Sequence, residues 1–258
     1  MQRLFLTPSE IADEAIKSGY KKANLTITKQ LTLGILAGAF IAFGAQGANM
    51  AVHAINNPGL AKLIAGLIFP AGLIMVVIAG AELFTGNSLM IMALADRQIT
   101  FLQLLRSWVV VYVGNLIGSV LIAYFVAKSG QFDFNGGQLG NFTINTALAK
   151  INLSFMQAFI RGILCNWLVC LAVWMSYGSD DLTGKVLVIF FPILLFVASG
   201  FEHSIANMYY IPAGIFADTQ NIISWSAMFT KNLIPVTLGN IVGGAFFVGI
   251  IYKFAYNS

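Results

Sequence analysis

The sequence predicts an all-α membrane protein with six transmembrane helices. Hydrophobic residues make up 58% of the 258 positions, and charged residues only 9%. A water-soluble domain carries roughly 25% charged residues, so this chain cannot cover a surface that faces water. A membrane-spanning helix needs about 20 mostly apolar residues. Six apolar runs reach that length, at 31–54, 60–95, 102–127, 153–177, 186–216 and 225–256.

The residues before the first apolar run, 1–27, are expected to form a short amphipathic helix on the cytoplasmic surface of the membrane. Thr7 and Glu10 have the spacing of a capping box, and Pro8 takes the first helical position. Ile11 then begins a modest apolar face. The connections between the apolar runs are short, so we expect 1–258 to be a single transmembrane domain without an attached soluble domain.

The distribution of lysine and arginine predicts the orientation. With an even number of spans, both termini lie on the same side of the membrane. Nine basic residues fall on that side: Arg3, Lys17, Lys21, Lys22, Lys29, Arg97, Arg106, Lys185 and Lys253. Five fall on the other: Lys62, Lys128, Lys150, Arg161 and Lys231. This excess predicts cytoplasmic termini. A nucleic-acid-binding role is excluded, because it needs a basic face on a soluble surface.

A motif of the form G-x-E-x-x-x-x-N occurs twice, at 80–87 and 200–207. Each copy follows a Phe-Pro pair and precedes a Gly-Asn-x-x-Gly element. These flanking elements lie at 69–70 and 191–192, and at 114–118 and 239–243. The first three spans thus resemble the last three, and because three is odd, the two copies must cross the membrane in opposite directions. The sequence therefore predicts an inverted 3+3 repeat, about 28–128 and 153–256, which is typical of transporters and channels.

Both motifs fall inside apolar runs that are longer than one straight span requires. They place Glu82 and Glu202 at membrane depth, where an ionisable group is costly and faces a cavity or a partner. The second and fifth spans are therefore expected to be broken at the motifs. A break exposes a helix N-terminus, whose free N–H groups and partial positive charge favour an anion. No run of acidic residues lines a path, which argues against a cation pore.

Two side chains in the breaks can donate hydrogen bonds to an anion, Thr85 and His203. His203 can stabilise an anion as a neutral or a protonated imidazole, or lend it a proton so that it crosses as the neutral acid. A histidine that only packs in the core is the alternative. We expect Glu82 and Glu202 to bind backbone amides or a neighbouring lysine and so to brace the breaks.

Four runs of the chain resemble the formate–nitrite transporter family, at 81–85, 170–177, 196–208 and 232–241. The resemblance extends over nearly the whole chain, and its motifs are highly specific. It implies an aquaporin-like fold of six helices and a homopentamer in the lipid bilayer, with a pore in each protomer. It also implies passage of a small monovalent anion (formate, nitrite or hydrosulfide), often with proton involvement, across the inner membrane of a bacterium.

By this resemblance His203 is the central pore histidine, Thr85 is its partner on the broken second span, and Lys150 is the basic residue that draws anions into the outer vestibule. The apolar constrictions match Phe69, Leu73, Leu83, Val169 and Phe196. The supporting residues are Glu82, Glu202, Asn166, Asn207 and Asn240. Two departures leave the hydrosulfide branch as open as the formate branch. Gly86-Asn87 stands where many formate channels have Ser and another small residue, and the connection between spans three and four is compact.

Two other classes of protein fit the residues less well. An aquaporin-like channel for neutral solutes predicts paired Asn-Pro-Ala breaks and an arginine filter, neither of which the sequence contains. A membrane enzyme predicts a metal site or a nucleophile beside a base. The two histidines lie far apart in the sequence, so we expect no metal and no cofactor. Cys165 and Cys170 are expected to be small packing residues.

Overall fold

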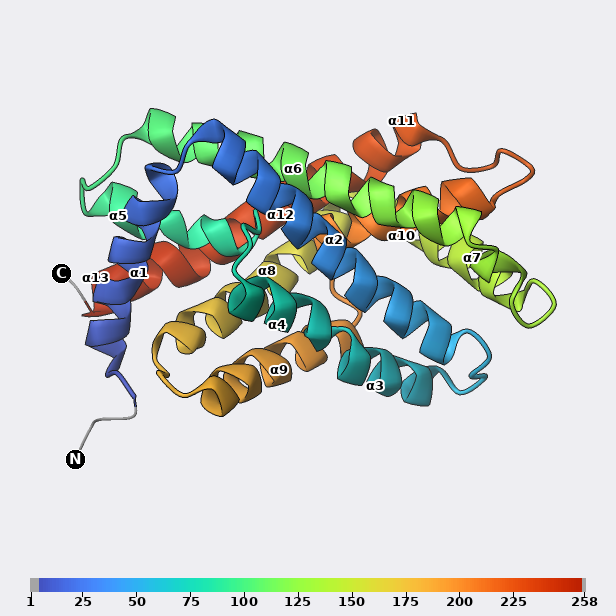
Figure 1. The fold of residues 1–258 in the computed structure, drawn as a ribbon, viewed down its shortest axis with the longest axis horizontal. Helices are drawn as coiled ribbons and strands as arrows, with labels where there is room; N and C mark the ends of the chain where they lie inside the picture. Colours follow the sequence, from blue (N-terminus) through green and yellow to red (C-terminus); the bar gives the residue numbers. More distant parts are fainter. Residues whose placement is uncertain (1–4, 257–258) are drawn as a thin grey trace.

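The computed structural model describes residues 5–256, and within that range it contains helices and no β-strand. Arg3, which contributes to the predicted charge asymmetry, lies outside the described residues. The first helix, α1 (Pro8–Ala23), begins with the predicted capping box between Thr7 and Glu10. It buries Ile11, Ala15 and Ile16 among the elements around it. Figure 1 shows α1 beside α13 (Ile251–Tyr256) at one end of the molecule.

The first half of the chain contains two long helices, α2 (Ile27–Val52) and α6 (Phe101–Lys128), with a broken segment between them. That segment begins with α3 (Pro58–Ile68) and α4 (Pro70–Ala79), which meet at the Phe69-Pro70 pair. The chain is then non-helical from 80 to 85. It resumes as a short 3₁₀ turn, η1 (Gly86–Met90), and α5 (Ile91–Ala95).

The second half repeats this order of elements. It begins with α8 (Phe155–Tyr177), and a broken segment follows: α9 (Leu182–Ala198), a non-helical stretch at 199–203, and α10 (Ser204–Ala217). The last helical stretch includes two π-helical parts, which disrupt the regular backbone hydrogen bonding of an α-helix. Its elements are α11 (Trp225–Ala227), η3 (Met228–Leu233), α12 (Ile234–Ile241), η4 (Val242–Ile250) and α13.

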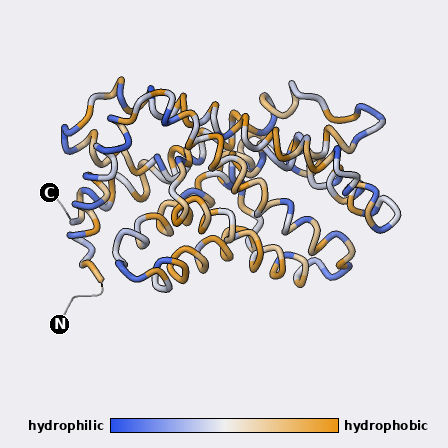
Figure 2. The backbone as a smooth tube through the Cα atoms, viewed as in Figure 1, coloured by the Kyte–Doolittle hydropathy of each residue, from blue (hydrophilic) through white to orange (hydrophobic). Residues whose placement is uncertain are grey.

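Five helical stretches within residues 5–256 are long and apolar enough to cross a membrane, which makes the chain a multi-pass membrane protein. They are Ile27–Val52, Pro58–Ala79, Phe101–Lys128, Phe155–Tyr177 and Trp225–Tyr256. The apolar run predicted at 186–216 differs, because the break at 199–203 divides it into two helices that are too short to span alone. Figure 2 shows apolar residues along α4 and α9 and polar residues gathered toward the two ends of the long axis.

The connection between α6 and α8 is not the compact loop expected from the sequence. It contains η2 (Gln131–Asp133) and a helix of 14 residues, α7 (Gln138–Ile151). Helix α7 packs against α10, at the end of the molecule opposite α1 (Figure 1). Its residues are too polar to form an apolar run, so the hydrophobicity of the chain did not reveal it.

Matched glycines bring the long helices into close contact in both halves. A Cβ atom at Gly114 would lie 3.0 Å from the Cα of Gly34, so α6 and α2 pack closely there. A Cβ atom at Gly239 would lie 3.1 Å from the Cα of Gly162, so α12 and α8 pack closely in the same way. Small residues at such crossings let helix backbones approach within the membrane. Side chains are therefore not tolerated at these positions.

Substitution of Gly239 by Ala is expected to destabilise the protein by about 1–3 kcal/mol, the usual range for overpacking. The new Cβ would clash with the carbonyl oxygen of Phe159, a backbone atom that cannot turn aside. Gly59→Ala is the matched control, because its nearest neighbour is a side-chain oxygen of Asn57 at 3.4 Å. Thermal unfolding in detergent would measure the difference, and equal melting temperatures for the two variants would contradict the packing argument.

Candidate functional site

The two breaks share one backbone geometry. Gly80 ends α4 with φ +81°, and Gly200 follows α9 with φ +70°. Both values lie in the left-handed region that glycine adopts without steric cost, so each glycine stops its helix in mid-protein. After the second break, His203 is the N-cap of α10, and its Nδ1 accepts a hydrogen bond from the Ala206 N–H at 3.0 Å.

A buried asparagine closes each break with the same three hydrogen bonds. Asn115 accepts from the Phe84 N–H at 2.9 Å and donates to the carbonyls of Glu82 and Gly34 at 2.9 and 2.8 Å. Asn240 accepts from the Ser204 N–H at 2.9 Å and donates to the carbonyls of Glu202 and Gly162 at 3.0 and 2.8 Å. These bonds satisfy backbone groups that would otherwise be orphaned at membrane depth.

Each glutamate of the repeated motif forms an ion pair with a lysine, as expected for a brace. Glu82 accepts from Lys22 at 2.9 and 3.0 Å and from the Asn87 amide at 2.8 Å. At the other break, Glu202 has the same two kinds of partner, a lysine and an asparagine. Glu202 accepts from Lys150 at 3.1 and 3.2 Å and from the Asn207 amide at 2.7 Å.

Lys22 is the partner that sequence reasoning missed. It lies on α1, sixty positions before Glu82, and no motif links the two residues. Burial by itself would lower the pKa of Lys22, but the attraction and hydrogen bond of Glu82 outweigh it and raise the pKa above its ordinary value. While Glu82 is ionised, the contribution of the Lys22 charge to stability is therefore complete below the unfolded lysine pKa, and it is lost as the pH rises through the folded lysine pKa.

Thr85 and His203 meet where the two breaks face each other. The Thr85 Oγ1 and the His203 Nε2 are 3.0 Å apart, although the residues are 118 positions apart in the chain. Both residues are buried, with 0% and 3% of their surface exposed. Because Nδ1 already accepts the Ala206 N–H, the neutral ring carries its proton on Nε2 and donates it to Thr85. The hydroxyl proton of Thr85 then remains free to be donated.

Helix α8 supports the backbone of Thr85. The Thr85 carbonyl accepts from the Asn166 amide at 3.2 Å and from the Cys170 thiol at 3.3 Å. The same Asn166 amide donates to the Asn240 carbonyl at 2.6 Å, so it links the two breaks. Cys170 therefore does more than pack in the core, the role that the sequence predicted, because its thiol also donates a hydrogen bond. No feature of the sequence around Cys170 indicated this contact.

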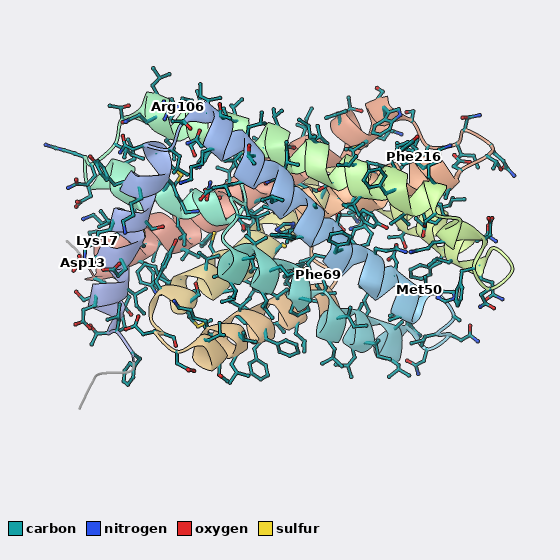
Figure 3. The ribbon with its side chains drawn as sticks, in the orientation of Figure 1. Asp13, Lys17, Met50, Phe69, Arg106 and Phe216 are labelled. Atoms are coloured by element: carbon teal, nitrogen blue, oxygen red, sulfur yellow. The ribbon has the colours of Figure 1, made fainter. Side chains whose placement is uncertain are left out.

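Two cavities lie on either side of this meeting point. One of about 500 Å³ is lined by Leu73, Leu83 and Glu82, and the other, of about 760 Å³, is lined by Phe69, Phe196 and His203. The rings of Phe69 and Phe196 stand edge to face with centroids 5.6 Å apart, and Phe196 stacks on the His203 ring at 5.9 Å. Figure 3 places Phe69 midway along the molecule, between Asp13 and Lys17 at one end and Met50 toward the other.

Val169 and Thr85 line neither cavity. Both are buried, Val169 with 1% of its surface exposed and Thr85 with none. The predicted constriction residues therefore lie in three places: Leu73 and Leu83 line the smaller cavity, Phe69 and Phe196 line the larger one, and Val169 lies within the core. No described residue lines both cavities.

The comparisons with known proteins agree with this arrangement. Residues 9–254 match the model of the family described as "Formate/nitrite transporter". The chain belongs to the formate/nitrite transporter family. It is 45% identical to "Uncharacterized transporter YrhG" of Bacillus subtilis, over 98% of this chain and 94% of that protein. It is 43% identical to "Probable formate transporter" of Methanothermobacter thermautotrophicus, over 98% of this chain and 97% of that protein. The predicted family is confirmed.

Solved structures of the formate/nitrite transporter family share the fold. A structure described as "Pentameric formate channel with formate bound" has a TM-score of 0.80 and 38% identity, and the match covers 90% of this chain and 98% of that one. One described as "FNT family ion channel" has a TM-score of 0.86 and 30% identity over 95% and 98% of the two chains. The relatives named here are transporters and channels.

Both cavities of this member of the formate/nitrite transporter family carry an excess of positive charge. The smaller is lined by Lys21, Lys22 and Lys29 against Glu82, and the larger by Lys62, Lys150 and Arg161 against Glu202. Clefts lined by one sign of charge raise the local concentration of ions of the opposite sign. Within residues 5–256, no three His, Cys, Asp or Glu side chains are grouped so that they could hold a metal ion.

Proposed function

We propose that this chain passes small monovalent anions, formate first among them, through a pore in each protomer of a homopentamer. The observation that carries the proposal is the Thr85–His203 hydrogen bond, which lies between two positively charged cavities and behind apolar side chains. A formate channel of Escherichia coli is 40% identical over 97% of this chain, and the "Pentameric formate channel with formate bound" supports the oligomer and the substrate. Nitrite and hydrosulfide are the other candidate anions.

The proposed architecture is six spans in an inverted 3+3 repeat with an aquaporin-like path. The segments α3–α5 and α9–α10 count as the broken second and fifth spans. The matched bonds of Asn115 and Asn240, the matched ion pairs of Glu82 and Glu202, and the matched glycine contacts all support the repeat. We propose repeat limits near 28–128 and 153–256 within one channel domain, with 1–27 as a cytoplasmic helix.

We infer an inner-membrane location with both termini in the cytoplasm. Helices α1 and α13 pack at the same end of the molecule, which supports a shared side for the termini (Figure 1). The smaller cavity, lined by Lys21 and Lys29 beside α1, then opens to the cytoplasm. The larger cavity, lined by Lys150, opens to the outside. This assignment follows the basic side of the charge asymmetry.

In the proposed mechanism an anion leaves a basic vestibule and passes the aromatic pair of Phe69 and Phe196. It then loses water, and its charge must be stabilised by fixed donors in a region of low dielectric. Thr85 supplies this donor, because its hydroxyl accepts from His203 and keeps its own proton for the anion. Neutral His203 thus orients Thr85 without carrying charge.

Proton-linked passage requires a larger change at His203. For the ring to become imidazolium, Nδ1 must take up a proton, and the hydrogen bond from the Ala206 N–H must then break. That bond is the N-cap of α10, and loss of a cap costs about 0.5–2 kcal/mol. The geometry therefore favours donation by the neutral pair, with proton lending as a second route that opens the cap.

The test is a stopped-flow assay of the full-length protein in liposomes. Formate, nitrite and hydrosulfide fluxes are compared at two pH values with liposomes that lack protein, and glycerol serves as the neutral solute. We expect anion flux well above the protein-free background and no accelerated glycerol flux. Glycerol flux without anion flux would overturn the proposal in favour of a channel for neutral solutes.

A further inference from the structure

The larger cavity contains two cations that the braces of the break do not use. Lys150 is committed there: its ammonium pairs with both oxygens of Glu202, at 3.1 and 3.2 Å, and lies 5.1 Å from the centre of the Tyr210 ring. Its charge is therefore largely compensated. Lys62 and Arg161 line the same cavity, and within residues 5–256 neither side chain has a hydrogen bond or an ion pair.

Both of these cations are held close to the break. The Lys62 Nζ lies 3.7 Å from the position that a Cβ atom would take at Gly200. It is near enough to Lys150, Arg161 and Glu202 for their charges to interact with its own. The backbone of Arg161 is fixed there as well, because its carbonyl accepts the Glu202 N–H at 3.2 Å. Two cations without a hydrogen bond or an ion pair among the described residues thus line one cavity.

The same cavity offers a hydrogen-bond donor that is not used. Asn49 lines it with 4% of its surface exposed, and its Nδ2 has no hydrogen-bond partner among the described residues. A buried polar group without a partner is uncommon and indicates an absent ligand or water. The cavity therefore combines free positive charge with a free donor, which is the chemistry that an oxyanion requires.

We propose that Lys62 and Arg161 form an anion site in the outer mouth that prefers a compact, doubly charged oxyanion such as sulfate. Two cations match two negative charges, whereas a monovalent anion leaves one cation uncompensated. A dianion cannot continue past Phe69 and Phe196, because the cost of moving an ion out of water rises steeply with its charge. External sulfate is then a blocker of formate uptake and not a substrate, and this part of the inference rests on the proposed function.

Binding is tested first, without any transport assay. Isothermal titration calorimetry with sodium sulfate on the detergent-purified oligomer is compared with sodium chloride at equal ionic strength. Lys62→Gln and Arg161→Gln are each expected to weaken sulfate binding about tenfold, the size of effect expected for one charge-assisted contact. Lys62→Arg and Arg161→Lys keep the charge and are expected to retain most of the affinity.

Lys128→Gln and Lys231→Gln are the matched controls. They remove the same charge on the same predicted side, but neither residue lines the cavity. If the two control variants weaken sulfate binding as much as Lys62→Gln does, the proposed site is wrong, and sulfate is attracted only by the overall positive charge. The same conclusion follows if chloride binds as tightly as sulfate at equal ionic strength. Size-exclusion chromatography verifies that each variant keeps the oligomer.

Block of transport is tested second. External sulfate is expected to reduce formate uptake into liposomes, and Lys62→Gln is expected to raise the half-blocking concentration by the factor seen in calorimetry. Sulfate accumulation inside the liposomes would overturn its role as a blocker. If formate uptake is absent, the proposed function fails, and the calorimetry still decides the sulfate site.

Discussion

His203→Ala is expected to lower formate flux on the order of 100-fold, the effect of removing one preorganised donor from a site of low dielectric. The loss arises because Thr85 no longer has the Nε2–H that orients its hydroxyl. The substitution also removes the N-cap of α10, which costs a further 0.5–2 kcal/mol or so of stability. Stopped-flow flux in liposomes and thermal unfolding in detergent measure the two effects separately.

His203→Asn separates transport from folding. Asparagine is among the best N-cap residues, so this variant keeps an acceptor for the Ala206 N–H but has no group that reaches Thr85 as Nε2 does. We expect its flux to fall as in His203→Ala while its melting temperature stays near that of the unmodified protein. Thr85→Val removes the hydroxyl at nearly constant volume and is expected to match the flux of His203→Asn. Unchanged flux of all three anions across pH 5–8 in these variants would refute the central role of the pair.

Lys150→Ala is expected to destabilise the protein by about 3–5 kcal/mol, because it leaves the Glu202 carboxylate buried without its partner. The side chain of Glu202 is only 6% exposed, so an unpaired charge there is costly. The family resemblance alone assigns Lys150 to anion attraction, which predicts reduced uptake in an intact oligomer. The ion pair adds a bracing role with a larger effect, measurable as lost oligomer on size-exclusion chromatography.

The double variant Lys150→Ala with Glu202→Gln distinguishes these roles. It removes the unpaired charge while keeping an amide for the Asn207 contact, and it is expected to recover most of the stability. Lys22→Ala with Glu82→Gln is the matched pair at the other break, where the side chains are more exposed, at 22% and 10%. The single variant Lys22→Ala is expected to destabilise the protein less than Lys150→Ala does. Equal stability of Lys150→Ala and the unmodified protein would contradict the brace.

Much of the fold could be predicted because hydrophobicity and helix breaks are local properties. The length of the apolar runs predicted the membrane helices, and Gly80 and Gly200 marked the places where helices end. The position of α7 was missed because this helix of 14 residues mixes polar and apolar side chains and carries no apolar run. The motif residues also predicted the family, which the comparisons confirm.

The sequence likewise predicted only part of the candidate site. The repeated motif singled out Glu82, Glu202 and His203, because ionisable groups at membrane depth are rare enough to stand out. It could not show that Lys22 pairs with Glu82, or that Asn166 and Cys170 hold the Thr85 carbonyl. Those contacts join residues many positions apart, and no periodicity along the chain encodes them.

By itself, the sequence determined that this protein crosses the membrane, that its halves share a motif with a glutamate at membrane depth, and that Thr85 and His203 belong to the two breaks. Only the tertiary structure decided which groups meet there. The direction of the Ala206 N–H places the proton of the neutral His203 on Nε2, and the positions of α1 and α7 supply a lysine to each glutamate. The physical reason is that burial and hydrophobicity act residue by residue, whereas ion pairs and hydrogen bonds depend on how distant segments pack.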